Sequence, residues 1–319
     1  MTSNRVLSQL LDELGLQSQE FLRIALRAPY TYKTFTIPKK NGGVRIISQP
    51  ARETKYIQGW LIKNLFCFLP VHSSAAAYCA GASIKKNAGA HKDNAFFVKM
   101  DFESFFPSIS TVDLRQHFKK NLPFLSDNEI QLFSRICSVK GIGYEGLSIG
   151  SPASPVLSNS VMHEFDSLAS EWACKNGFVY TRYADDLTFS TNMKDVSVGV
   201  EPMVRDVIGA IEYPSLRVNE KKTLHLSRKT SIKITGVVIN TSGQLSIGRV
   251  RKRQISSMVH RFTLGQLDEA KVHKLQGLLG YAYDLEPKFM NSLSNKYSPE
   301  IISELLKRRP VRQSEPNDQ

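Results

Sequence analysis

FVYTRYADDLTFST, residues 178–191, is the stretch of this 319-residue chain that decides its fold. Its aromatic and β-branched residues predict two short strands, joined by a tight turn that contains Asp185 and Asp186. The apolar stretch AFFVKMDF, residues 95–102, predicts another buried strand, and Asp101 stands near its end. If these strands are neighbours in one sheet, the three carboxylates meet at its edge.

These three aspartates predict a metal site. Each of them alone is an ordinary turn residue, so the prediction rests on their combination. Grouped carboxylates are hard oxygen ligands that suit Mg²⁺. Two such ions, about 3.5–4 Å apart, activate a hydroxyl, orient a triphosphate and stabilise the departing pyrophosphate.

The distribution of charge also favours a polyanionic partner. The net charge is +13. Residues 1–100 hold 14 Lys/Arg and 5 Asp/Glu, residues 101–247 hold 15 and 16, and residues 248–319 hold 13 and 8. A basic excess on both sides of an acidic middle is typical of an enzyme that holds metal ions against a phosphate backbone, although basic surfaces also serve solubility.

The composition predicts a cytoplasmic protein. No run of eighteen apolar residues predicts a membrane span, and the first residues lack the order of a signal peptide. The four cysteines form no CxxC pair, which favours reduced thiols over zinc or disulfides.

Other stretches predict an α+β protein. The expected helices are 4–28, 53–69, one that begins at Ser110 or Thr111, one that runs on from the Gly/Ser/Pro-rich stretch 146–159 to about Lys175, 196–212, and a basic helical tail from Gly248. The expected strands are a hairpin at 32–49 and a short pair at 232–247, and the tail after Pro310 is expected to be disordered.

Several boxes in this order resemble those of reverse transcriptases. They are Tyr183-Ala184-Asp185-Asp186, the box around Asp101 that runs to Ile109, Gly150-Ser151-Pro152-Ala153-Ser154-Pro155 with Asn159, Val218 to Thr223, and Arg45 in the hairpin. The resemblance extends from about residue 32 to 240. It implies a right-hand polymerase fold, with fingers at 1–100, a palm at 101–247 with an interleaved fingers segment at about 110–160, and a thumb at 248–319.

Two shorter boxes resemble those of retron enzymes in particular. Asn87-Ala88-Gly89-Ala90-His91 matches an NAxxH box, and Ile234-Thr235-Gly236 is similar to a VTG box. The length fits too, since group II intron enzymes carry a further maturase domain. This resemblance implies an RNA-directed DNA polymerase, a nucleotidyltransferase, that copies a structured non-coding RNA. It implies priming from an RNA 2′-hydroxyl, a branched msDNA product, and a phage-defence system with an effector protein.

The resemblance also implies roles for residues of the polymerase site. Asp101, Asp185 and Asp186 bind two Mg²⁺ ions, with help from the Phe102 carbonyl. Lys222, or its neighbour Lys221, protonates pyrophosphate. The remaining members contact the deoxynucleoside triphosphate: Arg45 and Lys40, with Lys39, at the phosphates, Phe106 under the sugar, and Gly150 and Pro152 through the backbone. Ile149 stands where the family often has Gln, which removes any role of that side chain in sugar discrimination.

For RNA binding the residues leave alternatives open. Asn87 and His91 contact RNA or make structural hydrogen bonds. Arg249, Arg251, Lys252 and Arg253 form a basic cluster that suits a thumb gripping RNA or the RNA–DNA duplex, or a solvated helix face. Tyr281 and Tyr283 stack on bases or pack. The rival functions are another reverse transcriptase, of the intron-like or abortive-infection kind, and a catalytically silent RNA-binding scaffold.

Overall fold

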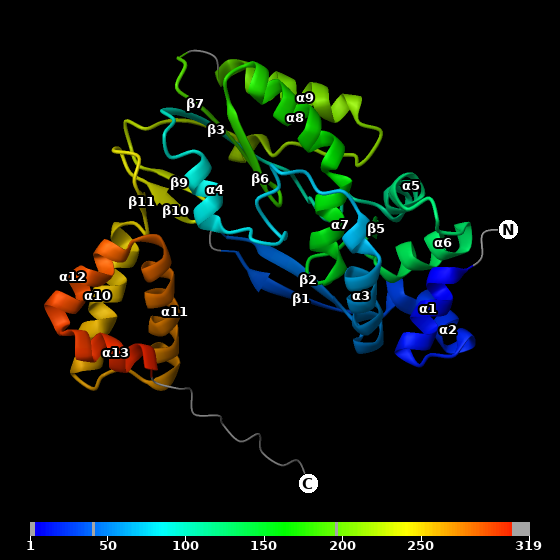
Figure 1. The fold of residues 1–319 in the computed structure, drawn as a ribbon, viewed down its shortest axis with the longest axis horizontal. Coiled ribbons are helices and arrows are strands. Elements are labelled where there is room, and N and C mark those ends of the chain that lie inside the picture. The colour runs from blue at the N-terminus through cyan, green and yellow to red at the C-terminus, as the bar shows by residue number, and fades with distance from the viewer. Residues whose placement is uncertain (1–3, 40–41, 195–196, 308–319) are drawn as a thin grey trace, which may run out of the picture. The chain divides into compact units, whose positions relative to one another are not determined.

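The computed structural model describes residues 4–39, 42–194 and 197–307. The chain divides into two compact units (Figure 1). The larger unit comprises Met1–Ser83 and Asn94–Ser227, and the smaller unit comprises Ile84–Asp93 and Arg228–Gln319. This division differs from the three predicted ranges in two respects, because residues 84–93 and residues 228–247 both fall in the smaller unit together with residues 248–319.

An antiparallel four-stranded sheet lies at the centre of the larger unit. Its strand order is β6–β7–β3–β8, with β6 at Val179–Tyr183, β7 at Asp186–Thr191, β3 at Phe96–Asp101 and β8 at Leu224–Ser227. Helix α8 (His163–Lys175) packs on β6 and on α9 (Val200–Ala210). Alternation along β3 buries Val98 and Met100 in the main core, as expected for a strand covered on one face.

The rest of the larger unit consists of a hairpin and helices. The hairpin pairs β1 (Tyr32–Pro38) with β2 (Val44–Pro50). The helices are α1 (Arg5–Leu14), α2 (Ser18–Arg27), α3 (Arg52–Asn64), α5 (Thr111–Asn121), α6 (Asp127–Ile136) and α7 (Ala153–Val161), with short turns η1 (Ala28–Tyr30), η2 (Phe66–Phe68), η3 (Ser197–Gly199) and η4 (Glu220–Lys222). A two-stranded ladder of β4 (Val139–Lys140) and β5 (Glu145–Gly146) precedes α7.

The smaller unit combines a short sheet with helices. The sheet order is β11–β10–β9, formed by Leu245–Ser246, Val237–Ile239 and Ile232–Ile234. Helix α4 (Ile84–Ala90) packs against this sheet although it is far away in the sequence. The remaining helices are α10 (Arg249–Thr263), α11 (Glu269–Leu285), α12 (Pro287–Tyr297) and α13 (Pro299–Lys307).

Most predicted elements are confirmed, the errors concern continuity and strand number, and α4, α6 and β8 lie in stretches for which no element was predicted. Helix α5 begins after a capping box in which Ser110 and Asp113 bond each other's backbone N–H groups. The single helix expected to end near residue 175 is instead two helices, α7 and α8, which meet at Met162. The predicted pair at 232–247 is a three-stranded sheet. The tail after Pro310 lies outside the described residues, within which no helix is long and apolar enough to cross a membrane.

Candidate active site

Strand pairing brings the predicted carboxylates together. Strand β3 pairs antiparallel with β7, and Asp101 stands directly opposite Asp186 in the register. Asp185 occupies the turn that precedes β7, and its carbonyl accepts a hydrogen bond of 3.1 Å from the Phe102 N–H. Cross-strand partners have Cβ atoms about 4.5–5.5 Å apart, so the acidic ends of the two strands form one edge.

The site concentrates negative charge. Burial, followed by the charge of Asp101, raises the pKa of Asp185. Burial, followed by the charge of Asp185, raises the pKa of Asp186 to about 6. Both shifts mean that ionised carboxylates are costly here without a positive partner, which is the electrostatic condition that a bound cation relieves.

Lys222 is such a positive partner for Asp101. Its Nζ donates to both carboxylate oxygens of Asp101, at 2.8 Å each. The Asn219 N–H bonds the Asp101 carbonyl at 2.7 Å and thereby fixes the turn that carries the lysine. Partial burial lowers the pKa of Lys222, but the contact with Asp101 outweighs it and leaves this pKa above its usual value. Of the two lysines considered, Lys222 is the one that reaches the carboxylates.

The donor set fits a divalent cation. Asp101, Asp185 and Asp186 supply the hard oxygen ligands that such ions prefer. Within the described part of the chain, no three His, Cys, Asp or Glu side chains are already gathered as a metal cluster. At Asp101 the Lys222 ammonium group already bonds both carboxylate oxygens. A cation that takes Asp101 as a ligand therefore competes with Lys222 for this carboxylate.

The predicted triphosphate contacts also lie in the larger unit. Arg45 is exposed on β2, opposite Ile37 in the register, and its charge lowers the pKa of Asp185 against the effect of burial. Lys39 is exposed at the hairpin turn, and Lys40 lies outside the described residues.

Gly150 and Pro152 are exposed just before α7. Gly150 has a φ of +112°, and a Cβ there would lie 2.9 Å from the Ser48 carbonyl on β2. The segment therefore packs closely against the strand that carries Arg45, and only glycine allows this approach.

The two adjacent phenylalanines after Asp101 have different environments. Phe105 is buried and stacks on Phe102 with ring centroids 6.0 Å apart. Phe106 is partly exposed, and its ring lies 6.5 Å from that of Tyr78. This difference favours Phe106 for the contact with the nucleotide sugar and Phe105 for the core.

Replacing Phe106 with Val is expected to increase ribonucleotide use relative to deoxynucleotide use by about tenfold, because the smaller side chain leaves room for a 2′-hydroxyl. Single-nucleotide incorporation kinetics with dNTP and rNTP measure the ratio of kcat/KM. Phe105→Leu is the matched control, and it should lower stability without changing the ratio. An unchanged ratio in Phe106→Val would remove Phe106 from sugar selection.

Tyr78 is a residue near this site that the sequence analysis did not identify. This residue has a φ of +59°, is about half exposed, and its ring lies 6.5 Å from that of Tyr183 as well as from Phe106. A tyrosine in the left-handed region is strained, and such strain often marks a functional position. The surrounding stretch AAAYCAG has no helical or strand periodicity, so only the tertiary structure shows that Tyr78 lies near Phe106 and Tyr183.

The two residues of the NAxxH box are buried. The exposed fraction is 2% for Asn87 and 0% for His91. The Asn87 amide donates to Thr235 Oγ1 at 3.3 Å, so the NAxxH box and the Ile234-Thr235-Gly236 box touch within the smaller unit. Burial lowers the pKa of His91 to about 3, which keeps this imidazole neutral. The structural alternative for Asn87 and His91 is therefore favoured over direct RNA contact.

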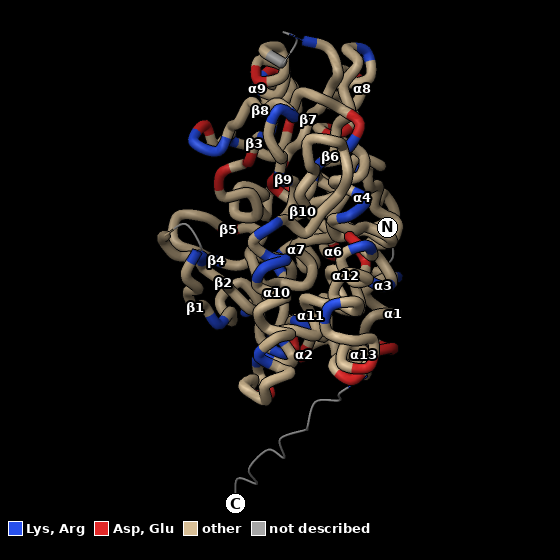
Figure 2. Tube along the Cα trace, turned by 90° about the vertical axis from the view of Figure 1, so that its left-hand side faces the viewer, with Lys and Arg blue, Asp and Glu red and all other residues tan. Residues whose placement is uncertain are grey.

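The basic cluster of α10 also has two kinds of members. Arg249 and Arg253 are exposed. Arg251 lies 4.8 Å from the centre of the Tyr281 ring and donates to the Gly236 carbonyl at 3.2 Å. Lys252 pairs with Glu286. The exposed pair is thus available for phosphate contact, and Figure 2 shows basic residues along α10.

The two tyrosines of α11 differ in the same way. Tyr281 is half-buried, and its hydroxyl donates to the Gly236 carbonyl at 3.2 Å. Tyr283 is exposed and makes the better candidate for stacking on a base.

Known proteins are similar to this chain in sequence or in fold. A family model described as reverse transcriptase (RNA-dependent DNA polymerase) matches residues 37–239. The retron Ec83 reverse transcriptase of Escherichia coli is 35% identical, over 86% of this chain and 90% of the relative. The retron Ec73 reverse transcriptase of the same species is 33% identical, over 92% and 95%. Telomerase from Candida albicans is 13% identical with a TM-score of 0.51, over 88% of this chain and 55% of the telomerase chain.

Proposed function

The chain belongs to the retron reverse transcriptases, and from this premise we propose that it copies a structured non-coding RNA into single-stranded DNA that stays joined to the RNA through a 2′-linkage. The coarser activity follows from the family: the chain is an RNA-directed DNA polymerase with a right-hand polymerase fold, and RNA and DNA are its partners. The priming hydroxyl and the branched msDNA product are the proposal.

The observation that supports polymerase chemistry in this chain is the pairing of Asp101 with Asp186 beside Asp185. We assign these three carboxylates, with the Phe102 carbonyl, to a divalent metal site, and we propose Mg²⁺ as the ion. A bound divalent cation supplies a lowered pKa for the attacking hydroxyl and charge neutralisation for the leaving pyrophosphate. The silent scaffold is disfavoured, because all three carboxylates are present at one edge, with Asp101 buried and Asp185 and Asp186 partly buried.

Other residues of the larger unit position the reactants. Arg45 pairs with phosphate oxygens of the triphosphate, and the backbone at Gly150 and Pro152 lies against the nucleotide. Phe106 lies under the sugar and excludes a 2′-hydroxyl. Lys222, held beside Asp101, delivers a proton to the pyrophosphate when its contact with the carboxylate is released.

We assign the three subdomains of the hand as follows. The larger unit holds the fingers and the palm, and helices α10–α13 of the smaller unit form the thumb. The contact between Asn87 and Thr235 supports the retron subtype, because it joins the two boxes that set this group apart. Arg249 and Arg253 supply phosphate contacts to RNA, and such binding weakens as salt concentration rises. By the same family reasoning we propose a role in phage defence with an effector protein.

The test is the chemistry of the nucleic acid bound to the protein. The chain is expressed with its native flanking DNA and purified, and the nucleic acid is treated with RNase and a debranching enzyme before sequencing. A discrete DNA joined by a 2′-linkage to one structured RNA is the expected result. If the nucleic acid is unbranched but the protein extends a supplied DNA primer on RNA, the assignment as a polymerase stands. Priming from an RNA 2′-hydroxyl would then be refuted.

A further inference from the structure

Arg182 is the largest of the fully buried side chains among the described residues. It lies on β6, just before the Tyr183-Ala184-Asp185-Asp186 turn. A guanidinium cannot leave water without partners for its charge and its N–H groups. The identity of those partners therefore indicates what this residue does.

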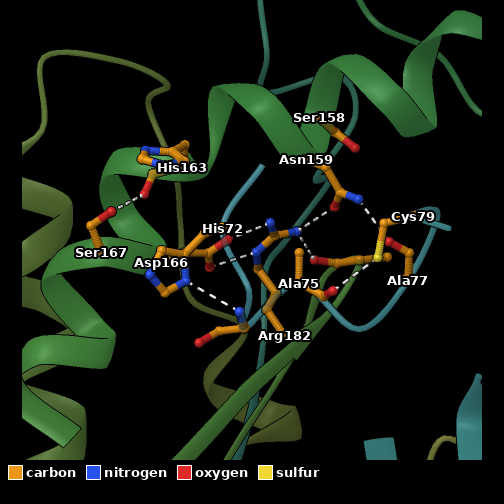
Figure 3. Close-up of polar contacts among 12 residues, drawn as sticks. His72, Ala75, Ala77, Cys79, Ser158, Asn159, His163, Asp166, Ser167 and Arg182 are labelled. Atoms are coloured by element: carbon orange, nitrogen blue, oxygen red, sulfur yellow. Dashed lines mark hydrogen bonds and ion pairs between the residues drawn. The ribbon is translucent and has the colours of Figure 1, made fainter. Parts of the chain in front are cut away.

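The guanidinium donates hydrogen bonds to two kinds of acceptor, a carboxylate and neutral oxygens (Figure 3). Its Nε and Nη2 donate to the two carboxylate oxygens of Asp166 on α8, at 2.8 and 2.6 Å. Its Nη1 donates to the carbonyl of Ala184 at 3.2 Å and to Asn159 Oδ1 at 3.3 Å. One side of the group is thus neutralised, and the other side holds the backbone of the turn.

The backbone that Arg182 holds is a strained one. Ala184 has a φ of +57°, in the left-handed region that disfavours any residue with a Cβ. Ala184 immediately precedes Asp185 and Asp186, so its conformation sets the direction in which both carboxylates leave the turn. Alanine itself disfavours a positive φ, so the hydrogen bond from Arg182 Nη1 to the Ala184 carbonyl is what stabilises this conformation.

We propose that Arg182 is a positioning residue that holds the turn in the conformation in which Asp185 and Asp186 bind the divalent cation. This inference rests on the proposed function of those carboxylates. Arg182 acts through the backbone: Asp166 pairs with its charge, and the charged neighbours that act on Asp185 are Asp101, Lys222 and Arg45.

The partners of Arg182 fix its own position. Asp166 also accepts a hydrogen bond of 2.8 Å from the Tyr180 hydroxyl, and burial keeps the pKa of Tyr180 well above its usual value, so this donor stays protonated. Asn159 on α7 donates to the Ala77 carbonyl at 2.7 Å. The Arg182 backbone bonds Ser74 and Ala76 at 2.8 and 2.7 Å. The guanidinium therefore joins α7 and α8 to the turn, and the Arg182 backbone joins the loop at 74–76 to β6.

Arg182→Lys is the variant that tests this role. Lysine keeps the positive charge for Asp166 but lacks the planar group that reaches Asp166 and Ala184 together. We expect the affinity for Mn²⁺ alone, measured by electron paramagnetic resonance on the full chain, to fall about tenfold, as for other residues that orient metal ligands. The kcat per titrated active site should fall by a similar factor, with a KM for dNTP within threefold of wild type.

Ala184→Gly separates positioning from simple stability. Glycine adopts a positive φ without penalty, so Ala184→Gly in the Arg182→Lys background should recover most of the lost Mn²⁺ affinity. Leu132→Ala, in the core of α6, is the control: it should lower the melting temperature and leave Mn²⁺ affinity unchanged. If Arg182→Lys does not fold, Asn159→Ala serves in its place, with a smaller loss of about threefold that Ala184→Gly again recovers.

Wild-type Mn²⁺ affinity in Arg182→Lys would overturn the proposal. So would a loss that Ala184→Gly fails to recover, since that result would assign Arg182 to stability alone. Because Mn²⁺ binding needs no template, primer or nucleotide, these results are independent of whether the protein makes branched DNA. Failure of the polymerase assay in the wild type would instead count against the proposed function.

Discussion

Replacing Asp185 and Asp186 together with alanine is expected to reduce DNA synthesis by about a thousandfold or more while RNA binding persists. The two carboxylates stand beside Asp101 at the edge of the four-stranded sheet. If they are metal ligands as proposed, their loss removes several kcal/mol of transition-state stabilisation, at about 1.4 kcal/mol for each tenfold in rate. Incorporation of labelled dNTP on a primed RNA template measures synthesis, and filter binding of the cognate RNA measures affinity.

A control variant that also loses negative charge tests whether the effect is specific to Asp185 and Asp186. Asp206→Ala removes an exposed carboxylate from α9 in the same unit and should leave synthesis unchanged. Synthesis at the wild-type rate in the double variant would refute the metal assignment. Loss of RNA binding along with synthesis would indicate an unfolded variant, which a thermal unfolding curve detects.

Local chemistry explains why much of the fold was predictable. The hairpin turn at Ala184 and Asp185, the alternation of β3, and the capping box at Ser110 are each decided by residues close together in the sequence. The meeting of Asp101 with Asp186 followed from one further assumption, that the two strands are neighbours. The family resemblance pointed to the same three residues.

The errors and omissions come from tertiary contacts. The break between α7 and α8 at Met162 has no glycine or proline to signal it. The burial of Asn87 and the attachment of Lys222 to Asp101 depend on partners more than a hundred residues away. Arg182 left a faint signal, because it shares the inward face of β6 with Tyr180, where a charge requires a buried partner.

The Lys222 contact leads to a prediction with two readouts that move in opposite directions. In Lys222→Met, kcat should fall about a hundredfold, which is the lower range for loss of a general acid. The affinity for Mn²⁺ alone should rise, because methionine removes the ammonium group that bonds both oxygens of Asp101. Rapid-quench incorporation gives the first quantity and electron paramagnetic resonance gives the second.

Lys221→Met is the matched control, because Lys221 is the neighbouring exposed lysine and Lys222 is the one bonded to Asp101. It should stay within twofold of wild type in both measurements. If Lys222→Met raised the affinity for Mn²⁺ but kept a normal kcat, the role of the lysine would be to neutralise Asp101 when no cation is bound. It would not be a general acid. If kcat fell and the affinity for Mn²⁺ did not rise, the contact between Lys222 and Asp101 would not compete with metal binding. Cation binding would then not require the lysine to move away from Asp101.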